Sequence, residues 1–217
     1  MDPGSQRKRK LGTENLGLRL MGYAMRSILI EATAALLPLL FAFRLLDFLR
    51  FRNFRRTWRY ALLGLYLAAV YSIVGLPTVQ FLTFDATVNL IPLLPMKEDL
   101  RNSILNILLF VPLGFFLPYL WSRYRRMGET LLVGFCTTLT IELGQLLTFR
   151  ITDINDILTN FTGCVVGYVL FRVYFLCKKG RVRTTGRSID LGIILGTVFP
   201  VMFFLQPLVA SFFYKLA

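Results

Sequence analysis

Polar side chains that could do chemistry gather in the second half of an otherwise apolar sequence. Glu142 and Gln145 are three residues apart, so on a helix they share one face, and Thr138 lies one turn before Glu142 on that face. An ionisable group inside a bilayer costs on the order of 3 kcal/mol or more, and such groups often mark functional sites. Glu142 is therefore the first candidate for a functional residue.

More polar residues surround this segment. Asn102 and Asn106 open an earlier apolar segment, and a polar stretch from Arg150 follows the segment of Glu142. If the apolar segments are membrane-spanning helices, all these positions lie at one end of a bundle. The predicted polar site comprises Asn106, Glu142, Gln145, Arg150, Asp153, Asp156 and Asn160.

Carboxylates and amides are suitable ligands for a hard cation such as Mg²⁺, and an arginine is suited to phosphate. A divalent cation is therefore one cofactor that this site could hold, although no spacing is diagnostic of a metal. The sequence contains no histidine, which removes the commonest neutral-pH base and a common zinc ligand. No catalytic residue can be assigned, and whether the protein is an enzyme stays open.

A structural role would explain part of the same pattern. Asp153 could cap the next helix, with Asp156 at its third position, where carboxylates satisfy free amides and suit the helix dipole. Glu142 could pair with Arg150, and the amide side chains could hydrogen-bond between helices. For Asp153 both interpretations stay open, whereas the depth of Glu142 in its apolar segment favours a function.

The elements that must position these residues are long apolar segments. The sequence is 55% hydrophobic with a mean hydropathy of +0.60, more apolar than is usual for a soluble domain. Six windows approach the roughly 20 residues that a membrane span needs. They are Ser27–Phe43, Tyr60–Val79, Ser103–Trp121, Leu131–Phe149, Ile157–Cys177 and Leu191–Phe213. We predict an all-α polytopic transmembrane bundle of about six spans, or five if the first, with Glu31 and Pro38, does not cross.

Lysine and arginine residues predict the orientation of the bundle. The segments 44–59, 123–126 and 172–187 hold six, three and six of them, whereas the alternate segments hold Lys97, Arg101, Arg150 and Lys215. Cytoplasmic loops carry the excess of basic residues, so the polar site is predicted to face outward. The net charge of +13 therefore reflects topology, and nucleic acid is not an expected partner.

Residues 1–20 are polar and basic and are predicted to form a flexible tail, part of which could come from cloning because Met21 and Met25 are both plausible native starts. Residues 21–217 would form the transmembrane helical domain. If the first window spans, this basic tail lies outside, against the charge rule.

Glycine and proline residues predict how the helices pack. Gly163 and Gly167 have the spacing that allows close approach of two membrane helices. Pro112 and Gly114 are predicted to interrupt the third window. The stretch 89–92 (Asn-Leu-Ile-Pro) is predicted to form a re-entrant or interfacial turn before it.

Taken in order, five motifs carry a family resemblance: Asn89-Leu-Ile-Pro92, Asn106-Ile-Leu-Leu-Phe-Val-Pro-Leu-Gly114, Glu142-Leu-Gly-Gln145, Arg150-Ile-Thr-Asp-Ile-Asn-Asp156, and Asn160 with Gly163. Together they resemble the VanZ-like family of bacterial membrane proteins over about residues 79–175. The resemblance implies a multi-pass protein of the bacterial cytoplasmic membrane with a role at the cell envelope. The family's named member lowers susceptibility to the glycopeptide antibiotic teicoplanin. The resemblance supports the seven site residues but supplies no reaction.

Three functions are compatible with these observations. The first is an envelope protein whose partners are membrane lipids and a lipid-linked or amphiphilic ligand bound at the polar site. The second is an intramembrane enzyme that acts on a lipid or polyprenyl-phosphate substrate. The third is a lipid transporter or flippase that uses the buried Glu142. The ligand and the oligomeric state stay open.

Overall fold

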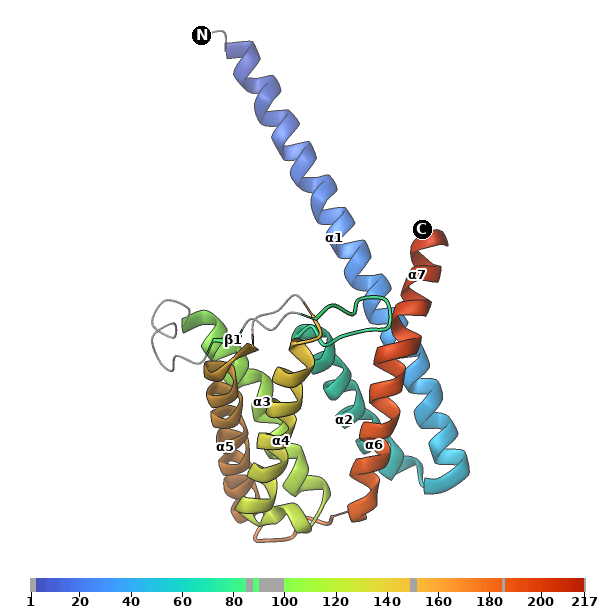
Figure 1. The fold of residues 1–217 in the computed structure, drawn as a ribbon, viewed down its shortest axis with the longest axis vertical. Helices are drawn as coiled ribbons and strands as arrows, with labels where there is room; N and C mark the ends of the chain where they lie inside the picture. The colour runs from blue at the N-terminus through green and yellow to red at the C-terminus, as the bar shows by residue number, and fades with distance from the viewer. Residues whose placement is uncertain (1–2, 85–87, 90–99, 149–151, 185, 217) are drawn as a thin grey trace.

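The chain forms a bundle of helices that run alternately in opposite directions in the computed structural model (Figure 1). The structure describes residues 3–84, 88–89, 100–148, 152–184 and 186–216. The α-helices are α1 (Pro3–Leu46), α2 (Phe54–Ile73), α3 (Leu100–Leu120), α4 (Met127–Gln145), α5 (Ile154–Cys177), α6 (Ser188–Pro200) and α7 (Gln206–Leu216). Two-residue strands β1 (Val88–Asn89) and β2 (Thr152–Asp153) pair in parallel. A π-helical turn (Val201–Leu205) joins α6 to α7.

Four helical segments are long and apolar enough to cross a membrane: Met21–Phe51, Leu100–Leu120, Ile154–Cys177 and Ile189–Leu216. The all-α prediction is therefore confirmed, but the count of about six spans is not. Helices α2 and α4 lie where two further spans were predicted, and their crossing stays a prediction. The first apolar segment, Met21–Phe51, extends past both ends of the predicted Ser27–Phe43, and α1 runs through Pro38 without a break.

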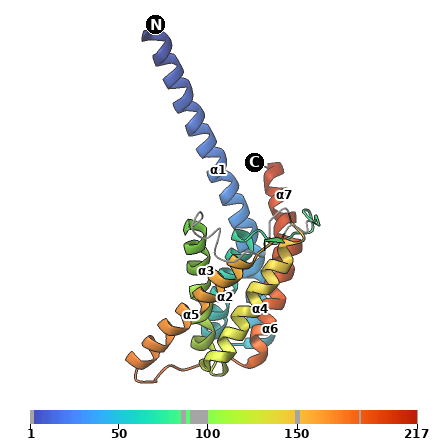
Figure 2. The same ribbon diagram turned by 60° about the vertical axis from the view of Figure 1, so that its left-hand side comes forward.

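The basic connections all lie at one end of the bundle. The links from α1 to α2, from α3 to α4 and from α5 to α6 share that end, whereas β1, β2 and both termini lie at the opposite end (Figure 1). This is the grouping on which the predicted orientation depends. Helix α1 extends past the other helices on the side of the termini in both views (Figure 2). The flexibility of residues 1–20 stays a prediction.

Three glycines allow α3 and α5 to pack with their backbones in contact. A Cβ atom at Gly163 would collide with the carbonyl oxygen of Ile107, and one at Gly167 with that of Val111. On the α3 side, a Cβ at Gly114 would collide with the carbonyl of Cys164. The close approach predicted from the glycine spacing is thus confirmed.

The predicted interruption of the third span is wrong. Helix α3 is continuous from Leu100 to Leu120 and contains both Pro112 and Pro118. A proline inside a helix removes one backbone hydrogen bond, but membrane helices tolerate this where neighbouring groups and local adjustments compensate. Gly114 serves the contact with α5 and does not end the helix.

Aromatic residues close the basic end of the bundle. The rings of Tyr60 and Trp121 stack with their centroids 5.7 Å apart. The Tyr60 hydroxyl donates a hydrogen bond to the buried carboxylate of Asp190 at 2.7 Å, and the Trp121 Nε1 donates to the Arg187 carbonyl at 2.9 Å. These contacts join α2 and the end of α3 to the start of α6.

Candidate functional site

One face of α4 carries the predicted polar residues into the bundle. Thr138, Glu142 and Gln145 are all buried, with Glu142 only 2% exposed. They follow the helical repeat, so they form a single stripe that faces the start of α5 and the end of α2. The predicted function required Glu142 to point into the bundle and not toward lipid, and its side chain is buried there.

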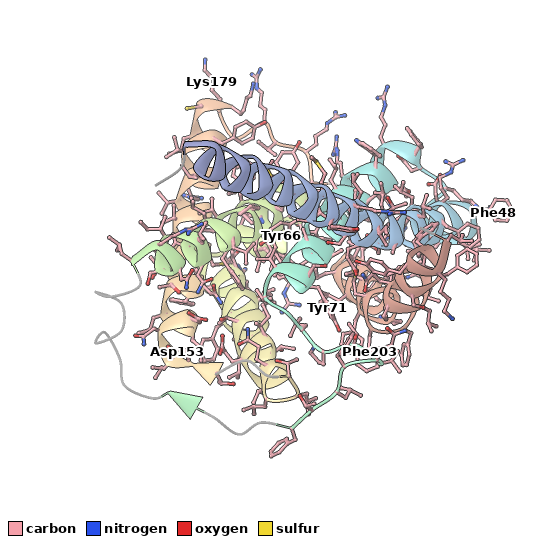
Figure 3. All side chains as sticks on the ribbon, turned by 90° about the horizontal axis from the view of Figure 1, so that it is seen from above. Phe48, Tyr66, Tyr71, Asp153, Lys179 and Phe203 are labelled. Atoms are coloured by element: carbon pink, nitrogen blue, oxygen red, sulfur yellow. The ribbon has the colours of Figure 1, made fainter. Side chains whose placement is uncertain are left out.

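The carboxylate of Glu142 binds the segment that leads into α5. Its Oε2 accepts a hydrogen bond from the backbone N–H of Asp153 at 3.0 Å, and the Thr152 hydroxyl donates to the Glu142 carbonyl at 3.1 Å. Strand β1 pairs with the same segment, with Asn89 opposite Asp153. Figure 3, seen from the end with the termini, shows Asp153 at the start of α5. The chain before α3 and the chain after α4 thus meet beside Glu142.

The predicted capping role of Asp153 is present. Its Oδ1 accepts hydrogen bonds from the backbone N–H and from the side-chain Nδ2 of Asn155, both at 2.8 Å. Asp153 is therefore the N-cap of α5, and Asp156 stands at the third helical position. Asp156 Oδ1 in turn accepts a hydrogen bond from Asn106 Nδ2 at 2.7 Å, which joins α3 to α5.

Two buried amide side chains each use only one of their polar groups. Asn160 Nδ2 donates to the Thr138 hydroxyl at 3.0 Å, and Gln145 Nε2 donates to the Val74 carbonyl at 3.0 Å. Asn160 Oδ1 and Gln145 Oε1 are buried and have no hydrogen-bond partner within the described part of the chain. A buried acceptor without a partner costs about 1–3 kcal/mol. Asn160 and Gln145 therefore each keep one unused hydrogen-bond acceptor inside the described part of the bundle.

The structure brings six of the seven predicted residues to one end of α3, α4 and α5. Asn106 pairs with Asp156, and Glu142 binds the backbone of Asp153. Asn160 on α5 binds Thr138 of α4, and Gln145 at the end of α4 binds the Val74 carbonyl. Arg150 lies outside the described residues, and so does its predicted pairing with Glu142.

Three further residues belong to this polar cluster. Thr138 was expected only to share the helix face of Glu142, whereas Thr152 and Asn155 were not predicted. Thr152 and Asn155 lie before and after the capping residue Asp153 in the sequence. This position could have indicated their role, since side chains beside a cap often bind the same turn.

The divalent-cation site that the carboxylates and amides left possible has no support in the described residues. Among them, no group of three or more Asp, Glu or Cys side chains is placed to hold a metal ion. The geometry gives the reason, because the Asp153 carboxylate caps α5 and the Asp156 carboxylate binds Asn106.

Comparison with known families decides the assignment. The model of the VanZ/LLP1 family matches residues 60–177, which is more than half of the chain. The chain belongs to the VanZ/LLP1 family. No curated protein and no solved structure matches it.

The VanZ/LLP1 match confirms the resemblance found in the sequence and extends it. The match runs from α2 to the end of α5 and contains all seven predicted site residues. Together with the four apolar helices, it identifies a multi-pass membrane protein. Helices α1, α6 and α7 lie outside the matched range.

Proposed function

We propose that this VanZ/LLP1 protein acts in the bacterial cytoplasmic membrane and lowers susceptibility to glycopeptide and lipoglycopeptide antibiotics such as teicoplanin. It does so by binding a lipid-linked or amphiphilic ligand at the polar ends of α3, α4 and α5. The observation that carries this proposal is the buried Glu142 carboxylate on the α4 face that also carries Gln145, together with the buried oxygens of Gln145 and Asn160 that have no partner among the described residues.

The chemistry of these groups limits the ligand. Carboxylate and amide oxygens accept hydrogen bonds and cannot donate them. A molecule that binds them must therefore supply N–H, ammonium or hydroxyl donors, as the sugars, amides and amines of envelope amphiphiles do. Because the site is desolvated, each such hydrogen bond is stronger than the same contact in water.

The surroundings of the cluster favour a ligand with a hydrocarbon part. Large apolar side chains next to the polar stripe face outward, including Leu143 at 57% and Leu158 at 42% exposure. In a bilayer these faces contact acyl chains. A ligand could thus keep its tail in lipid while its polar part enters the bundle. Teicoplanin also has an acyl tail, so it would meet the protein at the same level of the membrane.

The test is antibiotic susceptibility with charge-neutral variants. The protein is expressed in a susceptible bacterium, and the minimum inhibitory concentration of teicoplanin is measured for Glu142→Gln and Asp156→Asn. For both variants the minimum inhibitory concentration should fall to that of cells without the protein, while the amount of protein stays unchanged. Glu129→Gln is the matched control, because Glu129 lies on α4 but pairs with Arg123 at the basic end. Unchanged inhibitory concentrations in both site variants would refute the proposed site.

A further inference from the structure

A second feature lies outside the family match, between α1 and α7. Two open hollows adjoin each other there, and Arg26 lines both of them. The first has a volume of about 430 Å³ and is lined by Tyr23, Ala24, Arg26, Ser27, Ile30 and Tyr214. The second has a volume of about 300 Å³ and is lined by Arg26, Leu29, Ile30, Thr33, Phe213 and Leu216. Both hollows have mainly apolar walls, and the second, which four aliphatic or aromatic side chains line besides Arg26 and Thr33, is termed the apolar hollow.

Side-chain hydrogen bonds hold the two helices together at the base of these hollows. Glu31 on α1 accepts hydrogen bonds from Gln206 Nε2 and, at 3.1 Å, from the Tyr214 hydroxyl. Both oxygens of the carboxylate are thus engaged by donors from α7. The walls of the hollows are fixed by this contact, and Arg26 is the charged residue that lines them.

The lengths of the apolar segments indicate that the hollows lie near the level of lipid headgroups. Helix α3 has 21 residues, which at about 1.5 Å per residue match the roughly 30 Å hydrocarbon core. The segments Met21–Phe51 and Ile189–Leu216 have 31 and 28 residues and project past the other helices at the end with the termini (Figures 1 and 2). Arg26 and Leu216 lie near the projecting ends.

We infer that the two hollows hold one anionic phospholipid of the leaflet on this side, with its phosphate on Arg26 and an acyl chain against Leu29, Ile30 and Phe213. A guanidinium has five N–H donors, so it can bind phosphate oxygens while it keeps another partner. The apolar hollow continues from Arg26 toward Thr33, which is the direction of the membrane interior. A hollow that faces lipid is filled by lipid, and the arginine favours a negative headgroup. This site is separate from the polar site of α3, α4 and α5 and does not depend on the proposed resistance.

The test measures retained lipid on the full-length protein. Wild-type protein is reconstituted in nanodiscs that contain equal amounts of phosphatidylglycerol and phosphatidylethanolamine, extracted in mild detergent, and analysed by native mass spectrometry. The wild type should retain phosphatidylglycerol preferentially, and Arg26→Gln should reduce that retention at least tenfold. Arg44→Gln is the matched control, since Arg44 is an arginine on the same helix at the opposite end with its side chain 72% exposed.

A second variant tests the acyl-chain part with the charge intact. Leu29→Trp places a larger side chain in the apolar hollow and should reduce retention of phosphatidylglycerol, whereas Leu45→Trp, at an exposed apolar position near the basic end of α1, should not. Thermal unfolding in detergent checks that each variant is folded. If the Arg26→Gln variant does not fold, the lipid retention of the Leu29→Trp variant tests the inference instead. Equal retention of the two lipids by the wild type, or wild-type retention in the folded Arg26 or Leu29 variant, would overturn the inference.

Discussion

At the scale of single residues, Glu142 has a structural role in the fold, and we propose that it also binds a ligand. Its carboxylate accepts the backbone N–H of Asp153, so it helps to hold β2 at the start of α5. A hydrogen bond to a charged acceptor contributes about 1.5–3 kcal/mol. The side chain is also deeply buried on the α4 face that carries Gln145, where we propose that the ligand binds. Substitution can separate the structural role from the proposed ligand-binding role.

Glutamine and leucine at position 142 should differ in stability. Glu142→Gln keeps an oxygen that can accept the Asp153 N–H, so we expect the free energy of unfolding to fall by about 1 kcal/mol or less. Glu142→Leu removes the acceptor and should lower it by about 1–3 kcal/mol. Reversible unfolding in mixed detergent micelles measures both values. Equal losses would mean that the negative charge, and not the hydrogen bond, holds this segment.

The hydrogen bond between Asn160 and Thr138 gives a second prediction at this scale. Thr138→Val leaves the buried Asn160 Nδ2 without its acceptor, and we expect a loss of about 1 kcal/mol, typical of polar contacts between membrane helices. Thr137→Val on the same helix is the control, because the Thr137 hydroxyl donates to the carbonyl of Val133 in its own helix. The same detergent unfolding assay compares them, and a control loss as large as that of Thr138→Val would contradict the interhelical role.

At the scale of elements, the contact between α3 and α5 sets the geometry of the polar site. Gly163 lies one turn after Asn160, and it brings the α5 backbone against that of α3. This close approach lets Asn106 on α3 reach Asp156 on α5. Small residues in the middle of the membrane therefore determine how far apart the polar side chains at its edge lie.

Alanine at the packed glycines should separate the helices. Gly163→Ala and Gly167→Ala each place a methyl group against a backbone carbonyl, so we expect losses of about 1–3 kcal/mol. Gly192→Ala is the matched control in α6, where a Cβ would meet no atom within 4 Å and alanine should stabilise the helix by about 0.5–1 kcal/mol. Thermal unfolding in detergent tests this, and comparable losses at all three positions would exclude packing as the cause.

At the scale of the whole molecule, the distribution of basic residues follows the alternating direction of the helices. The connections rich in arginine share one end of the bundle, and the polar site, both termini and the hollows between α1 and α7 belong to the other. The excess of basic residues predicts that the first end is cytoplasmic. A ligand or antibiotic that arrives from outside the cell would then meet the polar site directly.

Cysteine labelling in intact cells tests this orientation. In a background without Cys136, Cys164 and Cys177, Phe84→Cys at the predicted outer end should react with a membrane-impermeant maleimide. Ser122→Cys in an arginine-rich link should react only after the membrane is permeabilised, because the link is predicted to be cytoplasmic. If only the Ser122→Cys variant is labelled in intact cells, the predicted orientation is wrong and the polar site faces the cytoplasm.

The helical bundle, the basic end and the cap at Asp153 could be predicted from the sequence by itself. Hydropathy, loop charge and capping depend on residues that are near one another along the chain, so each leaves a local pattern. The continuity of α3 could not be predicted, because prolines inside membrane helices are tolerated when the surroundings compensate.

Only the tertiary structure decided which polar groups meet. The pairing of Asn106 with Asp156 spans 50 residues, and that of Gln145 with the Val74 carbonyl spans 71. The sequence placed these residues at one end of the bundle, but their partners depend on how far each helix is rotated and how closely it approaches its neighbour. Those two quantities come from packing between segments distant in the chain, as at Gly163 and Gly167, and no local pattern records them.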